Sequence, residues 1–381
     1  MTHDFLAGVR VLDLSQFTPG PYATLMLADL GADVLKVEPP AGDPQRIDGP
    51  LDSDGVSAWY KLMNRGKTVV RLDLKSAEGR EAFAELLSMA DVLLESYRPG
   101  VMDRLGFPRE RLLGINPELV HCALSGWGQI GPYRLRAGHD LNYMAFGGGL
   151  AASGTAETPV MTSPPVADFA SGLFAALAAV AALVGRKGRR RGAFLDVSLA
   201  ETVLAWLSSD LTAALRPGFE PRRAANASNG GLACYQIYRT ADDRFLTLGI
   251  VEEKFWRNFC QAVGRSDWLP RQWEPMPQHG LIAELAALFR AHPLGHWESL
   301  LSSIDTCFHA VLDHGEIRRH PHVAARRMVA SEGGRDPFVE VLFPAWVDGE
   351  PPSARRPLRE VSVAGALEAW RAKARSSAAG P

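Results

Sequence analysis

The stretch Gly8–Pro40, "GVRVLDLSQFTPGPYATLMLADLGADVLKVEPP", decides the fold. It opens with a short apolar run, "VRVLDL", which is typical of a buried β-strand. The turn "TPGP" follows, with a proline where a helix favours one, and "YATLMLADL" continues as that helix. Gly31 suits the C-terminal end of the helix, and "ADVLKVE" predicts the next strand. The stretch therefore predicts a β–α–β unit.

The same alternation continues along the chain. "TVVRLDL" (68–74) predicts a strand, and Ser76 is placed to cap the helix of "EGREAFAELLSMA" (78–90). The short apolar runs "DVLLES" (91–96) and "LVHCALS" (119–125) predict further strands. Strands that alternate with helices predict an α/β fold with a parallel sheet and helices on its faces. The first turn lacks the G-x-G-x-x-G spacing of dinucleotide-binding folds.

A smaller second domain is expected after a linker. The composition changes at "RPGFEPRRAANASNGG" (216–231), which is typical of a linker. Beyond it, "CYQIYRTADDRFLTLGI" (234–250) predicts a hairpin with a polar turn. The segment "EEKFWRNFCQAVG" (252–264) predicts an amphipathic helix that ends at Gly264.

Composition excludes several classes of function. The 381 residues carry a formal net charge of -2, so no global charge recruits nucleic acid or anionic lipid. The four cysteines form no C-x-x-C pattern, which favours a reducing compartment over a disulfide scaffold or a zinc ribbon. The start lacks the features of a signal peptide, and the apolar run Phe169–Gly185 is a better buried helix than a membrane span. A cytoplasmic protein is expected.

The segment "RLRAGHDLNYMAFGGGL" (134–150) contains the first candidate site residue, His139. Three interpretations are open: a solvated loop residue, a metal ligand, or a group that transfers a proton. The metal interpretation is weak, because the segment has neither helical H-x-x-x-H spacing nor a cysteine partner. Glycines on both sides allow the backbone to approach a ligand closely. The segment also follows the strand 119–125, and α/β folds build ligand sites at the carboxyl ends of strands.

Other candidate residues carry charge. Asp168 directly precedes the long apolar helix, so it is an expected N-cap, and a carboxylate in that position can also act as a base or a nucleophile. The helix dipole favours its ionised form while burial disfavours it, and the sequence leaves the balance open. Glu252 lies between a predicted strand and a predicted helix. Lys67, Arg98 and Arg104 lie close to strand ends and are candidates for binding an anion.

Taken in order, four blocks resemble the family III CoA-transferases and, within that family, the α-methylacyl-CoA racemases. These blocks are "VLDLSQFTPGPYATLMLADLGADVLKVEPP", "NRGKTVVRLDLKSAEGRE", "DVLLESYRPGVMDRLG" and "LSGWGQIGPYRLRAGHDLNY". The resemblance covers nearly the whole chain, since "DFASGLFAALAAVAAL", "LDVSLAET" and "YRTADDRFLTLGIVEEKFW" also fit.

The resemblance implies an organisation of the chain and of its assembly. A large Rossmann-like CoA-binding domain is expected over 1–200, completed by 325–381. A linker helix and loop over 201–225 would lead to a small α+β domain over 226–324. Two chains would interlock as a homodimer, with the CoA thioester between the large domain of one chain and the small domain of the other.

The resemblance also implies a chemistry. The racemases have G-H-D where this chain has 138–140, and they transfer protons with residues that match His139, Asp168 and Glu252. The transferases use an aspartate matching Asp168 as a nucleophile and usually lack that histidine. The expected reaction is therefore the interconversion of (R)- and (S)-2-methyl-branched acyl-CoA thioesters. CoA transfer to a carboxylate is the alternative, and a catalytically silent homologue is a third.

Binding residues carry over from the same resemblance. No metal and no added cofactor are expected, and the CoA thioester is the substrate. Pro39 and Gly66 stand where relatives often have a basic residue and an asparagine, so Lys36 or Arg46 is expected to contact the nucleotide there. Neither the sequence nor the resemblance identifies the acyl chain of the substrate. The expected substrate and CoA contacts are Thr18, Asn64, Lys67, Tyr97, Arg98, Arg104, Asp140 and Tyr143.

Overall fold

A computed structural model describes residues 4–189 and 191–378. The chain forms two compact units. The first unit comprises Met1–Gly147, Pro164–Ala205 and His320–Pro381, and the second comprises Gly148–Ser163 and Trp206–Arg319. The domain boundaries drawn from the sequence stay predictions. No sequence pattern had grouped Gly148–Ser163 with the later segment.

The first unit is built on a seven-stranded sheet with the strand order β12-β3-β2-β1-β4-β5-β6. All six pairs of neighbouring strands are parallel. The α/β fold with a parallel sheet is thereby confirmed, as is the β–α–β unit that opens the chain. The strands are β1 (Arg10–Asp13), β2 (Asp33–Glu38), β3 (Thr68–Arg71), β4 (Val92–Glu95), β5 (Val120–Ser125), β6 (Ala193–Ser198) and β12 (Arg359–Val361).

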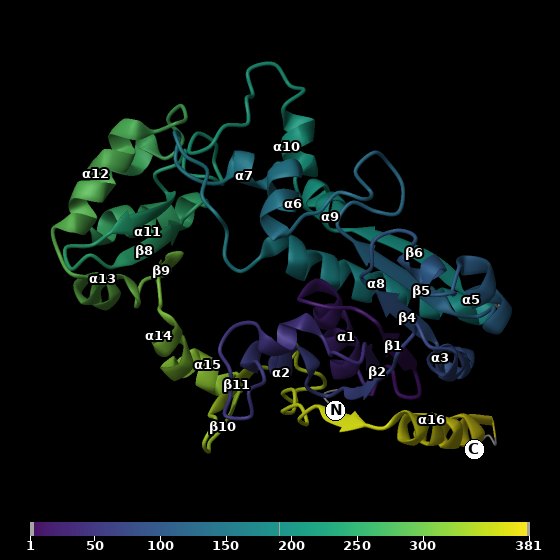
Figure 1. Cartoon of the computed structure of the whole chain (residues 1–381). Coiled ribbons are helices and arrows are strands. Elements are labelled where there is room, and N and C mark those ends of the chain that lie inside the picture. The colour runs from purple at the N-terminus through teal and green to yellow at the C-terminus, as the bar shows by residue number, and fades with distance from the viewer. Residues whose placement is uncertain (1–3, 190, 379–381) are drawn as a thin grey trace. The chain divides into compact units, whose positions relative to one another are not determined.

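Helices cover both faces of this sheet (Figure 1). Helix α1 (Pro19–Asp29) packs against α8 (Val166–Arg189), which also contacts β5 and β6. On the other face, α3 (Ala77–Met89) packs against α5 (Arg109–Ile115) and the C-terminal helix α16 (Val363–Ala378). The expected cap of α3 is confirmed, since the Ser76 hydroxyl accepts a hydrogen bond from the Gly79 N–H at 2.9 Å.

Shorter elements complete the first unit. A two-stranded antiparallel hairpin precedes the last strand of the large sheet. These elements are η1 (Pro44–Ile47), α2 (Ala58–Asn64), α4 (Val101–Arg104), α6 (Asp140–Phe146), α9 (Leu199–Trp206), α15 (Pro321–Ala325), β10 (Val329–Glu332) and β11 (Phe338–Val341).

The core explains why the end of the chain returns to the first unit. Alternate residues of the central strands, such as Leu12 and Leu35, face the α3 side and form one apolar cluster. Ala366 and Trp370 of α16 are buried in that cluster, and they are 2% and 3% exposed. Since burial of a tryptophan contributes a large apolar area, these two side chains fix α16 on the sheet.

A salt-bridge cluster fastens the segment that leads into β12. The Arg355 guanidinium pairs with Asp29 at the end of α1, with Nη2 to Oδ2 at 2.6 Å. It also pairs with Glu340 of β11, with Nη1 to Oε2 at 2.9 Å. All three side chains are almost completely buried. A planar guanidinium suits this geometry, because it donates to two carboxylates from fixed directions.

Helix α8 is long and apolar enough to span a membrane by length and composition, over Val166–Arg186. In this structure one face of α8 packs on α1 and the sheet, as the predicted buried helix would. The opposite face differs from that prediction, since Leu173, Leu177 and Val184 are 51%, 62% and 69% exposed. The buried face of α8 is rich in alanine, which allows close packing, whereas these larger side chains lie on the exposed face.

Gly172 sets the distance between α8 and α1. A Cβ atom at this position would lie 2.5 Å from the backbone oxygen of Pro19. We therefore expect Gly172→Ala to push the helices apart and to lower the free energy of unfolding by about 1–3 kcal/mol. Urea denaturation measures the change. Gly185→Ala on the same helix is the control. It meets nothing within 4 Å, so it should stabilise by about 0.5–1 kcal/mol. Equal effects of the two variants would contradict this account.

The second unit has its own sheet and core. The strands β7 (Tyr235–Arg239), β8 (Phe245–Gly249) and β9 (Phe308–Ala310) form an antiparallel sheet, which confirms the predicted hairpin. Its core is aromatic, with Trp256, Trp268 and Trp297 buried beside Phe259 and Phe289. The helices are α7 (Gly149–Ala152), α10 (Ser208–Ala213), α11 (Glu253–Ala262), η2 (Ser266–Arg271), α12 (His279–Arg290), α13 (Leu294–Leu301) and α14 (His314–Arg319).

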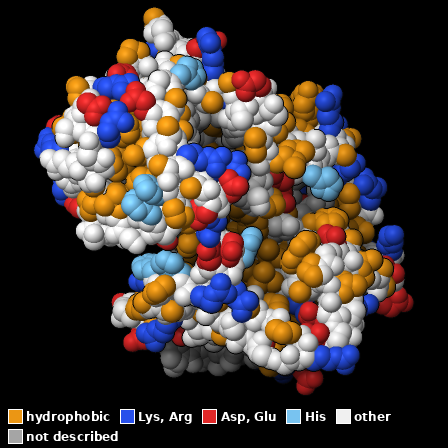
Figure 2. Space-filling view, turned by 90° about the vertical axis from the view of Figure 1, so that its left-hand side faces the viewer, with side chains coloured by type: hydrophobic (Ala, Val, Ile, Leu, Met, Phe, Trp, Pro, Cys, Tyr) orange, Lys and Arg blue, Asp and Glu red, His pale blue; other side chains and the backbone are white. Residues whose placement is uncertain are grey.

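The surface mixes charge of both signs. Lysine and arginine side chains alternate with aspartate and glutamate over the face drawn in Figure 2, with apolar side chains between them. This distribution agrees with the formal net charge of -2.

Candidate active site

The loop between β5 and α6 is held by a tyrosine. The Tyr143 hydroxyl of α6 donates a hydrogen bond to the Gly138 carbonyl at 2.8 Å. A Cβ atom at Gly126 would lie 2.1 Å from the same hydroxyl, and one at Gly138 would lie 2.8 Å from the ring. Both glycines are therefore needed for the loop to pack against the tyrosine. His139 ends this loop and is the N-cap residue of α6.

The starts of α6 and α8 meet through one carboxylate. Asp140 Oδ1 accepts hydrogen bonds from the backbone N–H groups of Ala167, at 2.7 Å, and Asp168, at 3.2 Å. Asp140 therefore caps α8, and the expectation that Asp168 is the N-cap is wrong, because Asp168 is the third residue of that helix. Since His139 is the neighbour of Asp140 in the chain, this contact brings His139 and Asp168 to adjoining helix starts.

The Asp168 carboxyl has an unusual proton affinity. Burial, with the nearby Asp140 carboxylate as a second cause, raises the pKa of Asp168 to about 7. A carboxyl with that pKa is present in both protonation states near neutral pH. It can therefore accept a proton in one direction of a reaction and return it in the other.

An aromatic cluster lies beside this pair of helix starts. The Trp127 ring makes edge contacts with Tyr133, Tyr143 and Phe146, at centroid distances of 5.3, 5.1 and 5.1 Å. Burial, and then the Asp168 carboxylate, raise the pKa of Tyr143 to about 12, whereas Arg98 opposes this shift. The tyrosine therefore stays protonated and keeps its hydrogen bond to the loop.

Two predicted CoA contacts present unpaired positive charge. Arg98 follows β4 and Arg104 ends α4, and both are exposed. Neither guanidinium forms a hydrogen bond or an ion pair with any residue in 4–189 or 191–378.

Thr18, half-buried, is the N-cap residue of α1, and its side chain makes no capping hydrogen bond. Burial, and then Glu95, raise the pKa of the partly buried Tyr97 to about 12.

Asn64 and Lys67 lie inside the core. Both side chains are fully buried. Lys67 Nζ donates to Asp13 Oδ2 at 3.2 Å, to Pro21 O at 2.9 Å and to Asn64 Oδ1 at 3.0 Å. Burial is the main cause that lowers the pKa of Lys67 to about 8. The three donors of this ammonium are used inside the protein, so the structure gives the pair a role in the core and no surface for an anion.

Lys36 and Arg46, which were expected to contact the nucleotide in place of a basic residue at Pro39, both pair with carboxylates of the protein. Lys36 is 1% exposed, and its Nζ lies 2.9 Å from Asp43 Oδ2. Arg46 Nε lies 2.7 Å from Glu38 Oε2. The expectation that Lys36 contacts the nucleotide is wrong in this structure, because its side chain is enclosed.

Glu252 belongs to the second unit. It is exposed and is the N-cap residue of α11. It is also close to Cys307, whose pKa is raised by burial and then by Glu252. Its pairing with His139 stays a prediction. Over 4–189 and 191–378, no three His, Cys, Asp or Glu side chains group as metal ligands would.

The capping role of Asp140 had a signal in the sequence. The residues before α8 are Pro164 and Pro165, which offer neither a side-chain acceptor nor a backbone N–H. A helix start that follows two prolines has no local cap, so its free N–H groups need an acceptor from elsewhere in the chain. The aromatic cluster had no comparable signal, because its members come from a loop and a separate helix.

Family membership follows from sequence similarity. The model of CoA-transferase family III matches residues 6–358. The chain belongs to this family. Two curated members of the family align with most of this chain. The α-methylacyl-CoA racemase of Mus musculus is 34% identical over 336 residues, 87% of this chain and 84% of the relative. The acetyl-CoA:oxalate CoA-transferase of Acetobacter aceti is 32% identical over 336 residues, 86% of each chain.

Solved structures agree with the family III fold. A CAIB/BAIF family protein from Brucella suis has a TM-score of 0.82 at 27% identity, over 97% of this chain and 98% of that one. A hypothetical protein from Mycobacterium tuberculosis has a TM-score of 0.78 at 25% identity, over 93% and 96%. This family III member is an enzyme of the CoA-transferase and racemase group. An acyl-CoA substrate is consistent with membership of that group.

The pH dependence of stability tests the Asp168 environment. The pKa of Asp168 is about 7, against 3.8 for the free side chain, so the native state holds a proton that the unfolded chain releases between those values. Stability should therefore fall as the pH rises from 4 to 7. Asp168→Asn mimics the protonated carboxyl, so its stability relative to the wild type should increase between pH 4 and 7. Above pH 7 the difference in stability should stay constant. Thermal unfolding from pH 4 to 9 measures the difference.

Asp140→Asn is the matched variant for that experiment. It keeps an oxygen for the two N–H groups of α8 and removes the like charge beside Asp168. The pKa of Asp168 should fall, and the decline in stability between pH 4 and 7 should become shallower. An unchanged pH profile in both variants would show that Asp168 is not a buried, proton-binding carboxyl.

Proposed function

We propose that the protein interconverts (R)- and (S)-2-methyl-branched acyl-CoA thioesters by 1,1-proton transfer at the α-carbon. The observation that carries the proposal is the meeting of the α6 and α8 starts. There the Asp140 carboxylate holds His139 and Asp168 at adjoining positions. A racemase needs two groups that exchange protons with one carbon from opposite faces, and we assign His139 and Asp168 to these two faces.

The proposed reaction moves one proton at a time. The thioester acidifies its α-carbon, because the charge of the enolate is delocalised onto oxygen. One side chain removes the α-proton and the C–H electron pair moves into the enolate. The other side chain then donates its own proton to the opposite face. Asp168, with its pKa near 7, suits either role, and His139, oriented by Glu252, would serve the second face.

The thioester needs further contacts. Backbone N–H groups around Gly138–Asp140 would steady the enolate oxygen, which contributes about 3 kcal/mol where the donors are aligned. The unpaired guanidinium groups of Arg98 and Arg104 suit the phosphates of CoA. A cytoplasmic, interlocked homodimer that needs no metal or added cofactor belongs to the same proposal.

CoA transfer is the second candidate. It is favoured by the transferases among the relatives, and Asp168 would be the nucleophile that forms an acyl anhydride. A carboxylate must be ionised both to attack a thioester and to remove an α-proton, so the pKa of about 7 serves the two reactions alike. The feature that favours proton transfer is His139, because the family resemblance associates a histidine at this position with the racemases and not with the transferases.

Deuterium exchange separates the two reactions. The protein is incubated in D₂O with (S)-2-methylacyl-CoA of several chain lengths, and a parallel sample contains free carboxylates. Deuterium uptake with loss of configuration supports the racemase. New thioesters in the carboxylate sample, without deuterium uptake, would overturn it and identify a transferase.

A further inference from the structure

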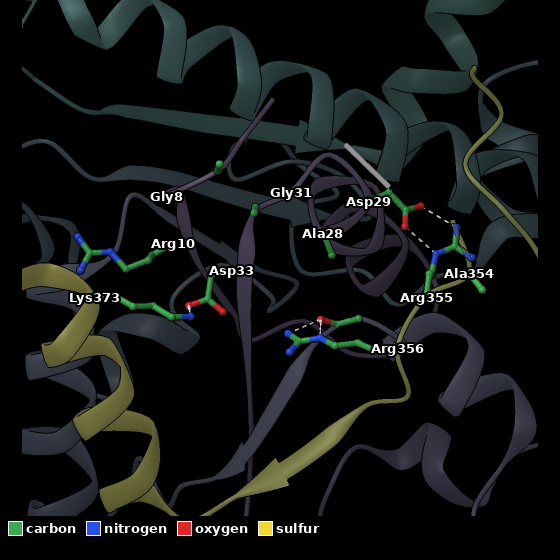
Figure 3. Close-up of a pocket in the computed structure, with 13 residues that line it drawn as sticks. Gly8, Arg10, Ala28, Asp29, Gly31, Asp33, Ala354, Arg355, Arg356 and Lys373 are labelled. Atoms are coloured by element: carbon green, nitrogen blue, oxygen red, sulfur yellow. Dashed lines mark hydrogen bonds and ion pairs between the residues drawn. The ribbon is translucent and has the colours of Figure 1, made fainter. Parts of the chain in front are cut away.

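A pocket lies at the amino ends of the strands of the large sheet, opposite the strand ends that lead to the His139 loop. Its volume is 690 Å³, and Arg10 and Asp33, the first residues of β1 and β2, lie on its wall (Figure 3). The loop with His139 follows the carboxyl end of β5, whereas this pocket is at the amino ends of the parallel strands. Pockets of about 300–1,000 Å³ suit small organic ligands. Its lining residues also include Ala28, Asp29, Gly31, Ala354, Arg355, Arg356 and Lys373.

Small residues make the apolar part of the wall. More than half of the lining positions are alanine or glycine. Gly8, Gly31 and Gly66 have φ values of +83°, +101° and +80°, which other residues rarely adopt. Because the backbone favours glycine at these points, no side chain projects from them. Methyl groups and exposed peptide planes of this kind fit the face of a planar apolar ring.

The cations around the pocket are not equally neutralised. Arg355 is balanced by Asp29 and Glu340, and Lys373 pairs with Asp33 at 2.6 Å. Arg356 differs, because among residues 4–189 and 191–378 its Nε and Nη2 donate only to the Gly66 carbonyl, at 3.1 and 2.9 Å. Figure 3 shows this exposed side chain beneath the pocket, with both bonds to one oxygen.

Arg10 is the second cation with spare donors. Its guanidinium Nε lies 3.9 Å from Asp91 Oδ2, and Arg186 Nη2 is closer to the same carboxylate, at 2.7 Å from Oδ1. Its Nη1 is buried and has no hydrogen-bond partner in the part of the chain that the structure describes. Because Arg10 and Arg186 share the single Asp91 carboxylate, this end of the strands keeps an excess of positive charge.

We propose that this pocket binds a small molecule with a planar apolar body and one phosphate or carboxylate group. The anionic group would accept from the free N–H groups of Arg356, in the positive field that Arg10 adds. The ring would lie against the alanine and glycine wall. This ligand is separate from the CoA thioester of the proposed function, and its site joins the end of α1 to the segment 354–356.

Calorimetric titration of the full chain tests the pocket with three probes that share one ring: 2-naphthyl phosphate, 2-naphthoate and 2-naphthol. Saturating acetyl-CoA is present throughout, so that the candidate active site is occupied. We expect one equivalent of phosphate or carboxylate probe to bind, and 2-naphthol to bind at least tenfold more weakly. The stronger of the two anionic probes identifies the anion that the site prefers. Absence of binding by both anionic probes would overturn the proposal.

Variants locate the binding. Arg356→Met should weaken the anionic probes about tenfold, and it should still fold because the side chain is exposed. Ala354→Trp should fill the pocket and abolish binding of all three probes. Arg216→Met removes an exposed arginine of the second unit and should change nothing. Undiminished binding in both pocket variants would overturn the proposal.

Discussion

Asp168→Asn is expected to reduce racemisation by about 10³-fold, because an amide cannot carry the proton for its face of the α-carbon. The variant should remain folded, since the amide resembles the protonated carboxyl that burial favours. Chiral analysis of (S)- and (R)-2-methylacyl-CoA after incubation in D₂O measures the loss. His139 is untouched, so one enantiomer should still exchange its α-proton for deuterium without inverting.

His139→Gln is the complementary variant. It should also stop inversion, and the exchange that remains should be found in the other enantiomer. Two variants with opposite surviving enantiomers would assign one face to each side chain. Equal exchange of both enantiomers in Asp168→Asn would contradict the two-base mechanism. Loss of CoA transfer to free carboxylates, with racemisation intact, would make Asp168 a nucleophile instead.

Arg355→Met is expected to lower the free energy of unfolding by about 3–5 kcal/mol, because it leaves the buried Asp29 and Glu340 carboxylates without their shared partner. Urea denaturation followed by tryptophan fluorescence measures the loss. The segment after β11 should also become more sensitive to proteolysis, since this ion pair fastens it to α1.

Arg371→Met is the control for that prediction. Arg371 also bonds a carboxylate, that of Glu85, but its side chain is 51% exposed. An exposed pair contributes less than about 1 kcal/mol, so this variant should be close to the wild type. Similar losses in the two variants would show that burial does not decide the strength of the Arg355 cluster.

The features predicted correctly from the sequence are those that short segments determine. The individual strands and the helix of the opening β–α–β unit, the Ser76 cap and the β7–β8 hairpin (235–249) each depend on residues that are close in the chain. Apolar periodicity, capping residues and turn residues act over that range. The roles of His139 and Asp168, which the family resemblance implies, stay predictions, although the structure places the two residues at adjoining helix starts.

The features that were missed depend on contacts between distant segments. Lys67 is near a strand end, as an anion-binding residue would be, but Asp13, 54 positions away, accepts from its ammonium inside the core. Asp140 caps a helix that starts 26 residues later, and only the two prolines before α8 hint at it. Residue type and local pattern do not show which way a side chain points, so burial of Lys67 and Lys36 could not be predicted.

The position of β12 has a consequence for how the chain folds during synthesis. This strand closes one edge of the large sheet by pairing Arg359 with Thr68, so β3 has no neighbour on that side until almost the whole chain has left the ribosome. The segment Trp206–Arg319, which is continuous, is complete earlier and has its own core. The inserted unit can therefore fold first, while the nascent chain still exposes an open sheet edge that invites aggregation. A nonsense mutation that removes only β12 and α16 would leave that edge open for the lifetime of the protein, although every candidate catalytic residue would be present.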